Sequence, residues 1–327
     1  MKFIALLPVF ILVMVSGCVM PFNTDPFQSE TPSGTGVIIE AFAPDFQTVY
    51  SGEEVTFRLK VKNTGSVTAK NGFAELLGID QIWLGEQSQT SAGGEVFPKE
   101  TQCRYDNKGI TLLPEQPDAG ITGGETTCTW VYKAPPVSTG LSVNSKPRAR
   151  FYYTYKTSTI KTITLVPKDE MKALQDQGKT LPIEAYSRTK SPISIDVETA
   201  SPIRTYGNEI GFPIVITVKN VGGGTVCLER SDNCKKPGGV QSNPEWNRLK
   251  INIVLASDLE LATGSCKKDG EEIVFTGKDP QTISCVIIAK NIDTQIGIIQ
   301  KNIEVDADYG YFIDKTTDVT VYPSAAP

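Results

Sequence analysis

The sequence predicts an all-β protein, with two tandem Ig-like antiparallel β-sandwich domains joined by a linker that holds a short helix. Three observations support this: apolar and polar residues alternate, the alternating segments end in Asn-x-Gly turns, and the pattern occurs twice. Residues 54–63 and 209–220 show the alternation most clearly. A period of two is typical of a strand with one buried face. Asn and Gly tolerate the positive φ of a tight turn.

The repeat extends well beyond the two turns. VKNTGS, which begins at Val61, returns as VKNVGG from Val218, 157 residues later. Cys128 and Cys285 are also 157 residues apart, and Cys103 and Cys266 are 163 apart. Two further related segments end at Pro167 and Pro323. The near-constant spacing indicates a duplicated domain, because solenoid repeats are only about 20–50 residues long.

Each copy contains seven segments with strand-like patterns, and frequent turns between short strands are typical of a β-sandwich. In the first copy they lie near 36–43, 54–63, 71–84, 108–113, 125–132, 148–156 and 159–166. In the second they lie near 192–198, 209–220, 249–259, 271–276, 282–289, 297–308 and 311–322. The expected domains are therefore residues 37–167 and 191–323, the latter with an insertion near 222–247, followed by a tail at 324–327.

The expected linker, 168–190, contains the one helix-like segment of the chain. It begins at Pro167 and ends at Gly178, which matches the preference for Pro at the start and Gly at the end of helices.

The N-terminal residues are typical of an exported lipoprotein. Lys2 precedes an apolar run that is too short to span a membrane comfortably, as in a secretory signal. The following Val-Ser-Gly-Cys resembles the lipobox of prokaryotic lipoproteins, which implies a signal peptide at 1–17 and a lipid on Cys18. A plain secretory signal with an incidental cysteine is the alternative. Residues 18–36 are rich in Pro, Ser, Thr and Gly and read as a flexible tether.

The composition argues against several functions. The chain has no histidine, which excludes imidazole metal ligands and nucleophiles activated by histidine. The net charge of −5 and the mixed charges lack the basic patch of a nucleic-acid-binding protein. We expect no cofactor and no enzymatic activity, although a carboxylate pair for glycoside hydrolysis stays open.

Six cysteines follow Cys18, an even number that is typical of disulfides in an exported chain. Equivalent positions in the two copies favour Cys103–Cys128 and Cys266–Cys285, which leaves Cys227–Cys234. The alternative is a zinc site made of Cys227, Cys234, Cys266 and Cys285, but its spacings differ from the usual CxxC pattern.

Other side chains could form ligand sites. Trp246 follows the Gly-rich insertion of the second copy, where it is either a possible ligand contact or a cap over the core. Asp306, Asp308 and Asp314 imitate part of a calcium loop, but Asp306 and Asp308 also share the outer face of a predicted strand. Tyr152, Tyr153 and Tyr155 read as core or cross-strand residues, with sugar stacking as the alternative.

The stretch GEEVTFRLKVKNTG and the weaker IGFPIVITVKNVGGG resemble CARDB modules, the cell-adhesion-related Ig-like domains of bacterial and archaeal surface proteins. The resemblance rests on a Gly-x-x-Val opening, an alternating strand and an Asn-x-Gly turn, and it covers about the first half of each repeat. It implies a β-sandwich outside the cytoplasm and no catalytic residues.

Together these observations predict a lipid-anchored protein on the outer side of the cytoplasmic membrane, with a structural, adhesive or scaffold role. The expected partners are the membrane, through the lipid, and a surface protein or polysaccharide. The alternatives are a lipoprotein that captures a soluble ligand such as a glycan, and a subunit of a surface filament that assembles by edge-strand addition.

Overall fold

The computed structural model describes residues 36–79, 83, 103, 109–230, 234–235, 245–277, 279–292 and 297–324. These belong to one compact unit, residues 32–327. They are mostly β-strand, which confirms the predicted all-β sandwich class. The expected signal peptide 1–17, Cys18 and nearly all of the tether lie outside the described residues. So does the end of the predicted tail.

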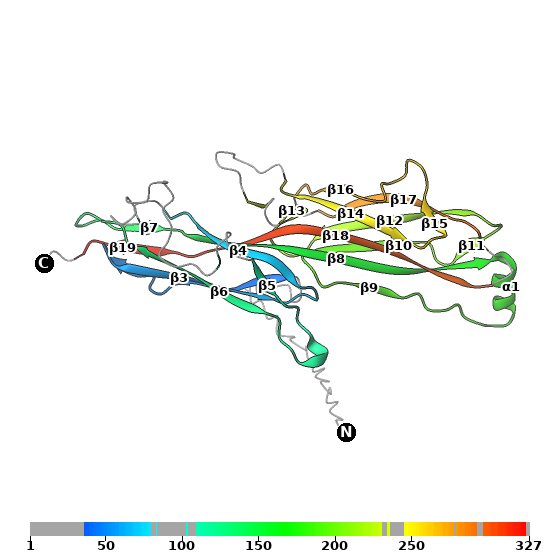
Figure 1. Ribbon diagram of the computed structural model, residues 1–327, viewed down its shortest axis with the longest axis horizontal. Helices are drawn as coiled ribbons and strands as arrows, with labels where there is room; N and C mark the ends of the chain where they lie inside the picture. Colours follow the sequence, from blue (N-terminus) through cyan, green and yellow to red (C-terminus); the bar gives the residue numbers. More distant parts are fainter. Residues whose placement is uncertain are drawn as a thin grey trace, which may run out of the picture. The chain divides into compact units, whose positions relative to one another are not determined.

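The strands form four sheets (Figure 1). One sheet contains β1 (Val37–Pro44), β3 (Glu54–Asn63) and β6 (Glu125–Lys133), and another contains β10 (Ile193–Thr199), β12 (Ile210–Asn220), β17 (Gln281–Ala289) and β15 (Leu259–Leu261). A small sheet contains β2 (Thr48–Tyr50), β19 (Val319–Tyr322) and β7 (Val143–Ser145).

The largest sheet has nine strands and includes strands from both repeats. Its main path is β16 (Glu271–Val274), β14 (Arg248–Leu255), β18 (Ile299–Thr316), β8 (Arg148–Pro167), β4 (Ala69–Leu77) and β5 (Ile110–Leu112). Three short strands pair beside this path: β9 (Tyr186–Arg188), β11 (Ile203–Thr205) and β13 (Thr225–Leu228).

The alternating sequence explains how these sheets pack. In β3, Phe57, Leu59 and Val61 are fully buried, whereas Arg58 between them is exposed. In β12, Ile214 and Ile216 are buried in the same way. Most of the buried apolar residues of both repeats belong to one continuous core. The alternation predicted for these two strands is therefore confirmed.

One short helix, α1 (Lys168–Asp176), lies in the predicted linker. Its side chains Met171 and Leu174 are buried, so the linker packs onto the body through them. Among the described residues, no helix has the length and apolar character needed to cross a membrane.

Strands β8 and β18 differ from the prediction. The sequence suggested a break near residues 157–158 and another near 309–310. Instead each strand is continuous, and the two pair antiparallel from Leu165–Ile299 at one end to Arg148–Thr316 at the other. Residues 156–158, Lys-Thr-Ser, contain no Gly, Pro, Asn or Asp. Of the residue types common in tight turns they contain only Ser158, and the strand runs on through it without a break.

Because β8 and β18 do not turn back, each repeat gives its last segment to the other. The end of β8 pairs in parallel with β11 of the second repeat, with Leu165 opposite Ile203. The last strand of the second repeat, β19, pairs in parallel with β2 of the first, with Val321 opposite Val49. We call this arrangement the strand exchange. The domain boundaries at 37–167 and 191–323 stay a prediction. The last strand segment of each predicted domain pairs with a strand of the other domain.

Candidate functional site

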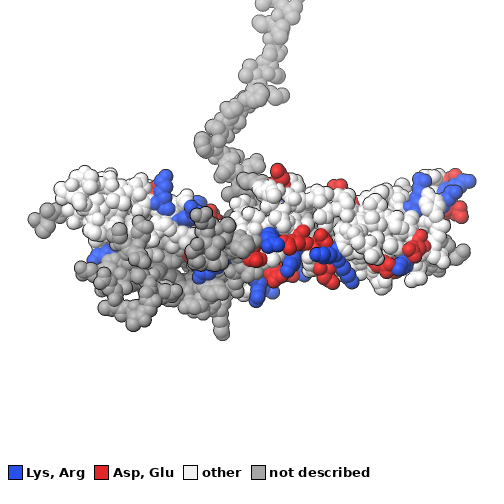
Figure 2. Space-filling model, turned by 90° about the horizontal axis from the view of Figure 1, so that it is seen from above, with Lys and Arg blue, Asp and Glu red and all other residues white. Residues whose placement is uncertain are grey.

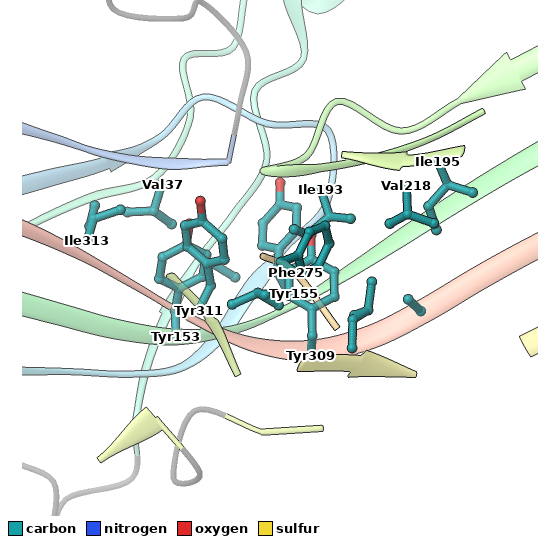
Figure 3. Packing of buried hydrophobic residues seen from close by; sticks show 14 of the residues in the cluster. Val37, Tyr153, Tyr155, Ile193, Ile195, Val218, Phe275, Tyr309, Tyr311 and Ile313 are labelled. Atoms are coloured by element: carbon teal, nitrogen blue, oxygen red, sulfur yellow. The ribbon is translucent and has the colours of Figure 1, made fainter. Parts of the chain in front are cut away.

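Four tyrosines meet on the paired strands β8 and β18 where this pair passes from one repeat to the other (Figure 3). We call this place the strand crossing. Tyr155 lies opposite Tyr309, and Tyr153 lies opposite Tyr311. All four side chains are at most 2% exposed. The Tyr153 and Tyr155 ring centroids are 5.9 Å apart with an edge-to-face geometry, and those of Tyr153 and Tyr311 are 5.7 Å apart. Burial raises the pKa of Tyr155 to about 12 and those of the other three well above their usual value. These rings form a structural core, so sugar stacking on Tyr153 or Tyr155 would require opening it.

The repeated Asn-x-Gly turns are fixed to this crossing. The Asn63 amide donates hydrogen bonds to the carbonyl oxygens of Val67 (2.8 Å) and Leu112 (3.0 Å). Its Oδ1 accepts a hydrogen bond from the Gly65 N–H at 3.1 Å. The Tyr155 hydroxyl accepts one from the Val67 N–H at 3.2 Å. The asparagine is fully buried, and these bonds satisfy its amide.

The second copy repeats this arrangement. The Asn220 amide donates to the Gly224 carbonyl at 2.8 Å, and its Oδ1 accepts from the Gly222 N–H at 3.3 Å. The Tyr311 hydroxyl donates to Asn220 Oδ1 at 2.6 Å and accepts from the Gly224 N–H at 2.9 Å. The duplicated VKN-x-G motif thus joins each turn to the strand crossing, which is a structural role.

A second apolar cluster lies apart from the main core. We call it the outer cluster, and it consists of Phe73, Tyr152, Cys227, Cys234 and Phe312, with Trp246 packed against it. The Phe73 and Tyr152 rings stack with centroids 4.5 Å apart. The first repeat supplies Phe73 and Tyr152, and the second supplies the rest. The outer cluster is therefore a further contact between the repeats.

Trp246, for which the sequence offered a ligand contact or a cap over the core, belongs to this cluster and is partly buried. Its indole N–H donates to the Cys234 carbonyl at 2.8 Å. Its ring lies 5.1 Å from the Phe312 ring, centroid to centroid. The side chain thus packs against the cluster that contains Cys227 and Cys234. A role in ligand binding is not tested by these contacts and stays a prediction.

Arg150 connects the outer cluster to the strand crossing. Its guanidinium carbon lies 4.0 Å from the Phe312 ring centroid and 5.5 Å from that of Trp246. Its Nε and Nη2 donate to the two carboxylate oxygens of Asp314 at 2.6 and 2.7 Å. Burial disfavours the charged guanidinium, but hydrogen bonding and attraction to Asp314 outweigh this, so the pKa of Arg150 is raised. The sequence gives no sign of this role for Arg150, because its partners are distant along the chain.

Two of the three carboxylates that resembled a calcium loop, Asp306 and Asp314, are paired with other side chains. Asp306 accepts a hydrogen bond from the Asn252 amide at 3.1 Å and pairs with Lys156 at 3.1 Å. Asp314 is held by Arg150. Within the described residues, no group of three or more Cys, Asp or Glu side chains could hold a metal ion. Figure 2 shows acidic and basic side chains mixed in a band on the face that it displays, which is typical of a solvated surface with local ion pairs.

Three disulfides link Cys103–Cys128 and Cys266–Cys285, the pairs that the repeat favoured, and Cys227–Cys234, the pair that remained. In this state the four cysteines of the alternative zinc site have no free thiolates. Disulfides persist in oxidising compartments, so their presence indicates an exported protein.

Exposed apolar side chains gather around the small sheet, a feature that the sequence analysis did not single out. Tyr50 and Tyr322 are neighbours in the parallel β2–β19 pair, and they are 51% and 42% exposed. Leu141 and Val143, at the start of β7, are 64% and 41% exposed. The signal available in the sequence was the uncharged stretch 134–145.

Comparisons with known proteins identify no family. No family model and no curated protein matches the chain. One solved structure, from work titled "The Enterococcus faecalis MSCRAMM ACE binds its ligands by the collagen Hug Model", is 10% identical, with 88% of this chain and 95% of that chain covered. Its TM-score is 0.12, which carries no argument about fold or function. The resemblance to CARDB modules stays a prediction.

Proposed function

We propose that the chain is a lipid-anchored cell-surface protein with a structural, adhesive or scaffold role. Its tandem β-sandwich repeats would be presented outside the membrane on the tether at 18–36. Cys18 would carry the lipid, and the partner would be a surface protein or polysaccharide. The protein would act by presenting a rigid surface rather than by catalysis.

The observation that carries the proposal is a β-sheet protein cross-linked by disulfides that follows an N-terminal segment resembling a lipobox. Three disulfides close loops within it, and a shared sheet joins the repeats. A body of this kind keeps its shape in an oxidising environment and presents loops and edges to partners. The side chains of the crossing and of the outer cluster are used for packing and ion pairs, which favours a structural role.

Intact-mass analysis and membrane fractionation test the anchor. Native protein should carry a lipid mass on Cys18, and reduction should add the mass of six hydrogens for three disulfides. Cys18→Ser should move the protein from the membrane fraction to the medium or to a soluble fraction, whereas the matched Met20→Ala should leave it attached. Unmodified Cys18 in native protein would contradict the anchor.

Capture of a soluble glycan is the second candidate, and the partly exposed Trp246 beside Arg150 favours it. A glycan array probed with the oxidised protein tests this candidate. Binding that is lost in Trp246→Ala and retained in Trp83→Phe, a change at a buried tryptophan, would support capture at Trp246. Concentration-dependent polymers without a ligand would instead support the filament alternative.

A further inference from the structure

The first and last described strands of the chain lie in the same part of the fold. β1 pairs antiparallel with β3, from Val37–Asn63 to Pro44–Phe57. β2, which follows β1 directly, runs parallel to β19. The β2–β19 pair is flanked by hydrogen bonds from the Thr320 N–H to the Gln47 carbonyl and from the Ser51 N–H to the Tyr322 carbonyl, both 2.8 Å long. The first and last described segments of the chain are therefore joined through neighbouring strands.

The parallel direction determines how a stretching force acts on this pair. A pull on the N-terminal side first loads β1, which is paired with β3, and through it draws β2 back toward its own start. A pull on the C-terminal side draws β19 forward toward its own end. The two strands are then drawn past each other along their axes. In this shear geometry the hydrogen bonds of the pair bear the load together, whereas peeling breaks them one after another. Single hydrogen bonds are weak, so sharing the load raises the rupture force.

The same pull acts along the axis of the β8–β18 ladder, because β19 directly continues β18. This ladder joins 18 residue pairs. Side chains link it along its length: Arg150 pairs with Asp314, the Ser158 hydroxyl donates to Glu304 at 2.9 Å, and the Thr162 hydroxyl donates to Asn302 at 2.9 Å. To release β18 along its axis, a force must break the ladder and these bonds.

We infer that the strand exchange makes this chain a load-bearing element, in which tension between its two ends is resisted in shear by β2–β19 and β8–β18. The inference deepens the proposed function and rests on it, since a protein held to a membrane by its N-terminal side bears tension between its two ends when a partner pulls on the C-terminal side of its body. Two independent sandwiches in series would instead each bear the load alone and open one at a time.

Single-molecule stretching of the full oxidised chain tests the inference through two attachment geometries. Handles at the two chain ends load β2–β19 in shear. Handles at the C-terminus and at the exposed Leu141, which precedes β7, lie at the same end of the antiparallel β7–β19 pair. They peel β19 away from β7 one hydrogen bond at a time. We expect the end-to-end geometry to need a higher force for its first rupture than the geometry that uses Leu141, because forced unfolding follows the unfolding rate of the bonds that are loaded. Equal or lower force end to end, or two similar sequential steps that each release one repeat, would overturn the inference.

A pair of proline variants tests which bonds carry the load. Thr320→Pro removes the N–H that donates to the Gln47 carbonyl and should lower the first end-to-end rupture force. Ser324→Pro adds a proline just beyond β19 and should leave that force unchanged. Thermal melting establishes that both variants are folded at the temperature of the measurement. If folded Thr320→Pro ruptures at the wild-type force, β2–β19 does not bear the load. These measurements use no membrane, so they stand or fail independently of the lipid on Cys18.

Discussion

Arg150 and Asp314 lie directly opposite each other on β8 and β18 and form a bidentate ion pair, although they are 164 residues apart in the chain. Arg150 belongs to the first copy of the repeat and Asp314 to the second. The pair can form only because β18 runs on into the first repeat instead of turning back. It therefore reports directly on the strand exchange.

Arg150→Met should destabilise the protein by about 2 kcal/mol, because it leaves the Asp314 carboxylate without its main partner and removes the stacking on Phe312. Urea unfolding of the oxidised protein measures this change. Arg188→Met is the matched control, since Arg188 forms an exposed pair with Asp196, and it should cost about 0.5 kcal/mol or less. Equal small losses in both variants would contradict the importance of the Arg150–Asp314 pair.

Tyr311→Phe should be more damaging than Tyr155→Phe, although the two residues occupy equivalent places. The Tyr311 hydroxyl makes hydrogen bonds of 2.6 and 2.9 Å. The equivalent Tyr155 bonds are 3.4 and 3.2 Å long. We expect losses of about 1.5 and about 0.5 kcal/mol in the free energy of unfolding. The reverse order would show that the two turns are not fixed as the structure describes.

Alkaline pH should unfold the protein through its buried tyrosines. Burial raises the pKa of Tyr132 and of Tyr155 to about 12 each, against about 10 in an unfolded chain. Their contribution is therefore complete below pH 10 and is lost as the pH rises from about 10 to 12. Each of these two tyrosines should lower the free energy of unfolding by about 1.4 kcal/mol for every pH unit in this range. Urea unfolding of Tyr132→Phe should show a correspondingly smaller slope than wild type, and an unchanged slope would contradict the assignment.

The first repeat alone, residues 32–167, should not form a stable monomer. Its last segment, 159–167, has no tight turn through which to return to its own β2. Two fragments can instead exchange this segment, because Ile163 and Leu165 are the counterparts of Val319 and Val321, all four of which are buried. We expect a strand-exchanged dimer or an unfolded chain by light scattering after chromatography. A cooperatively folded monomer would show that exchange is not needed.

Much of the fold could be predicted because its signals are local. The alternation of Phe57, Leu59 and Val61 predicted β3 over the same residues that the structure gives. The repeat made Cys103 equivalent to Cys266 and Cys128 equivalent to Cys285, and this favoured two of the three disulfide pairs. The linker helix was visible from Pro167 and Gly178.

The strand exchange could not be read from the same signals. A period of two looks alike in one long strand and in two strands of a hairpin, so residues 148–167 admitted both. Gly310 favoured a turn, but it lies within β18 opposite Thr154. The partners of Arg150 and Trp246 are distant in sequence, and neither residue type specifies a partner. The absence of Gly, Pro, Asn and Asp at 156–158 was a local sign of the continuous strand.

Methyl–methyl nuclear Overhauser effects in the oxidised protein, with its Ile, Leu and Val methyl groups labelled, test the strand exchange most directly. The exchange places Val49 beside Val321 and Ile203 beside Leu165, so these two pairs should give cross-peaks. Repeats that keep their own last strands would instead give cross-peaks between Val49 and Leu165 and between Ile203 and Val321. The second pattern without the first would contradict the exchange, and with it the shared ladder and the load-bearing role.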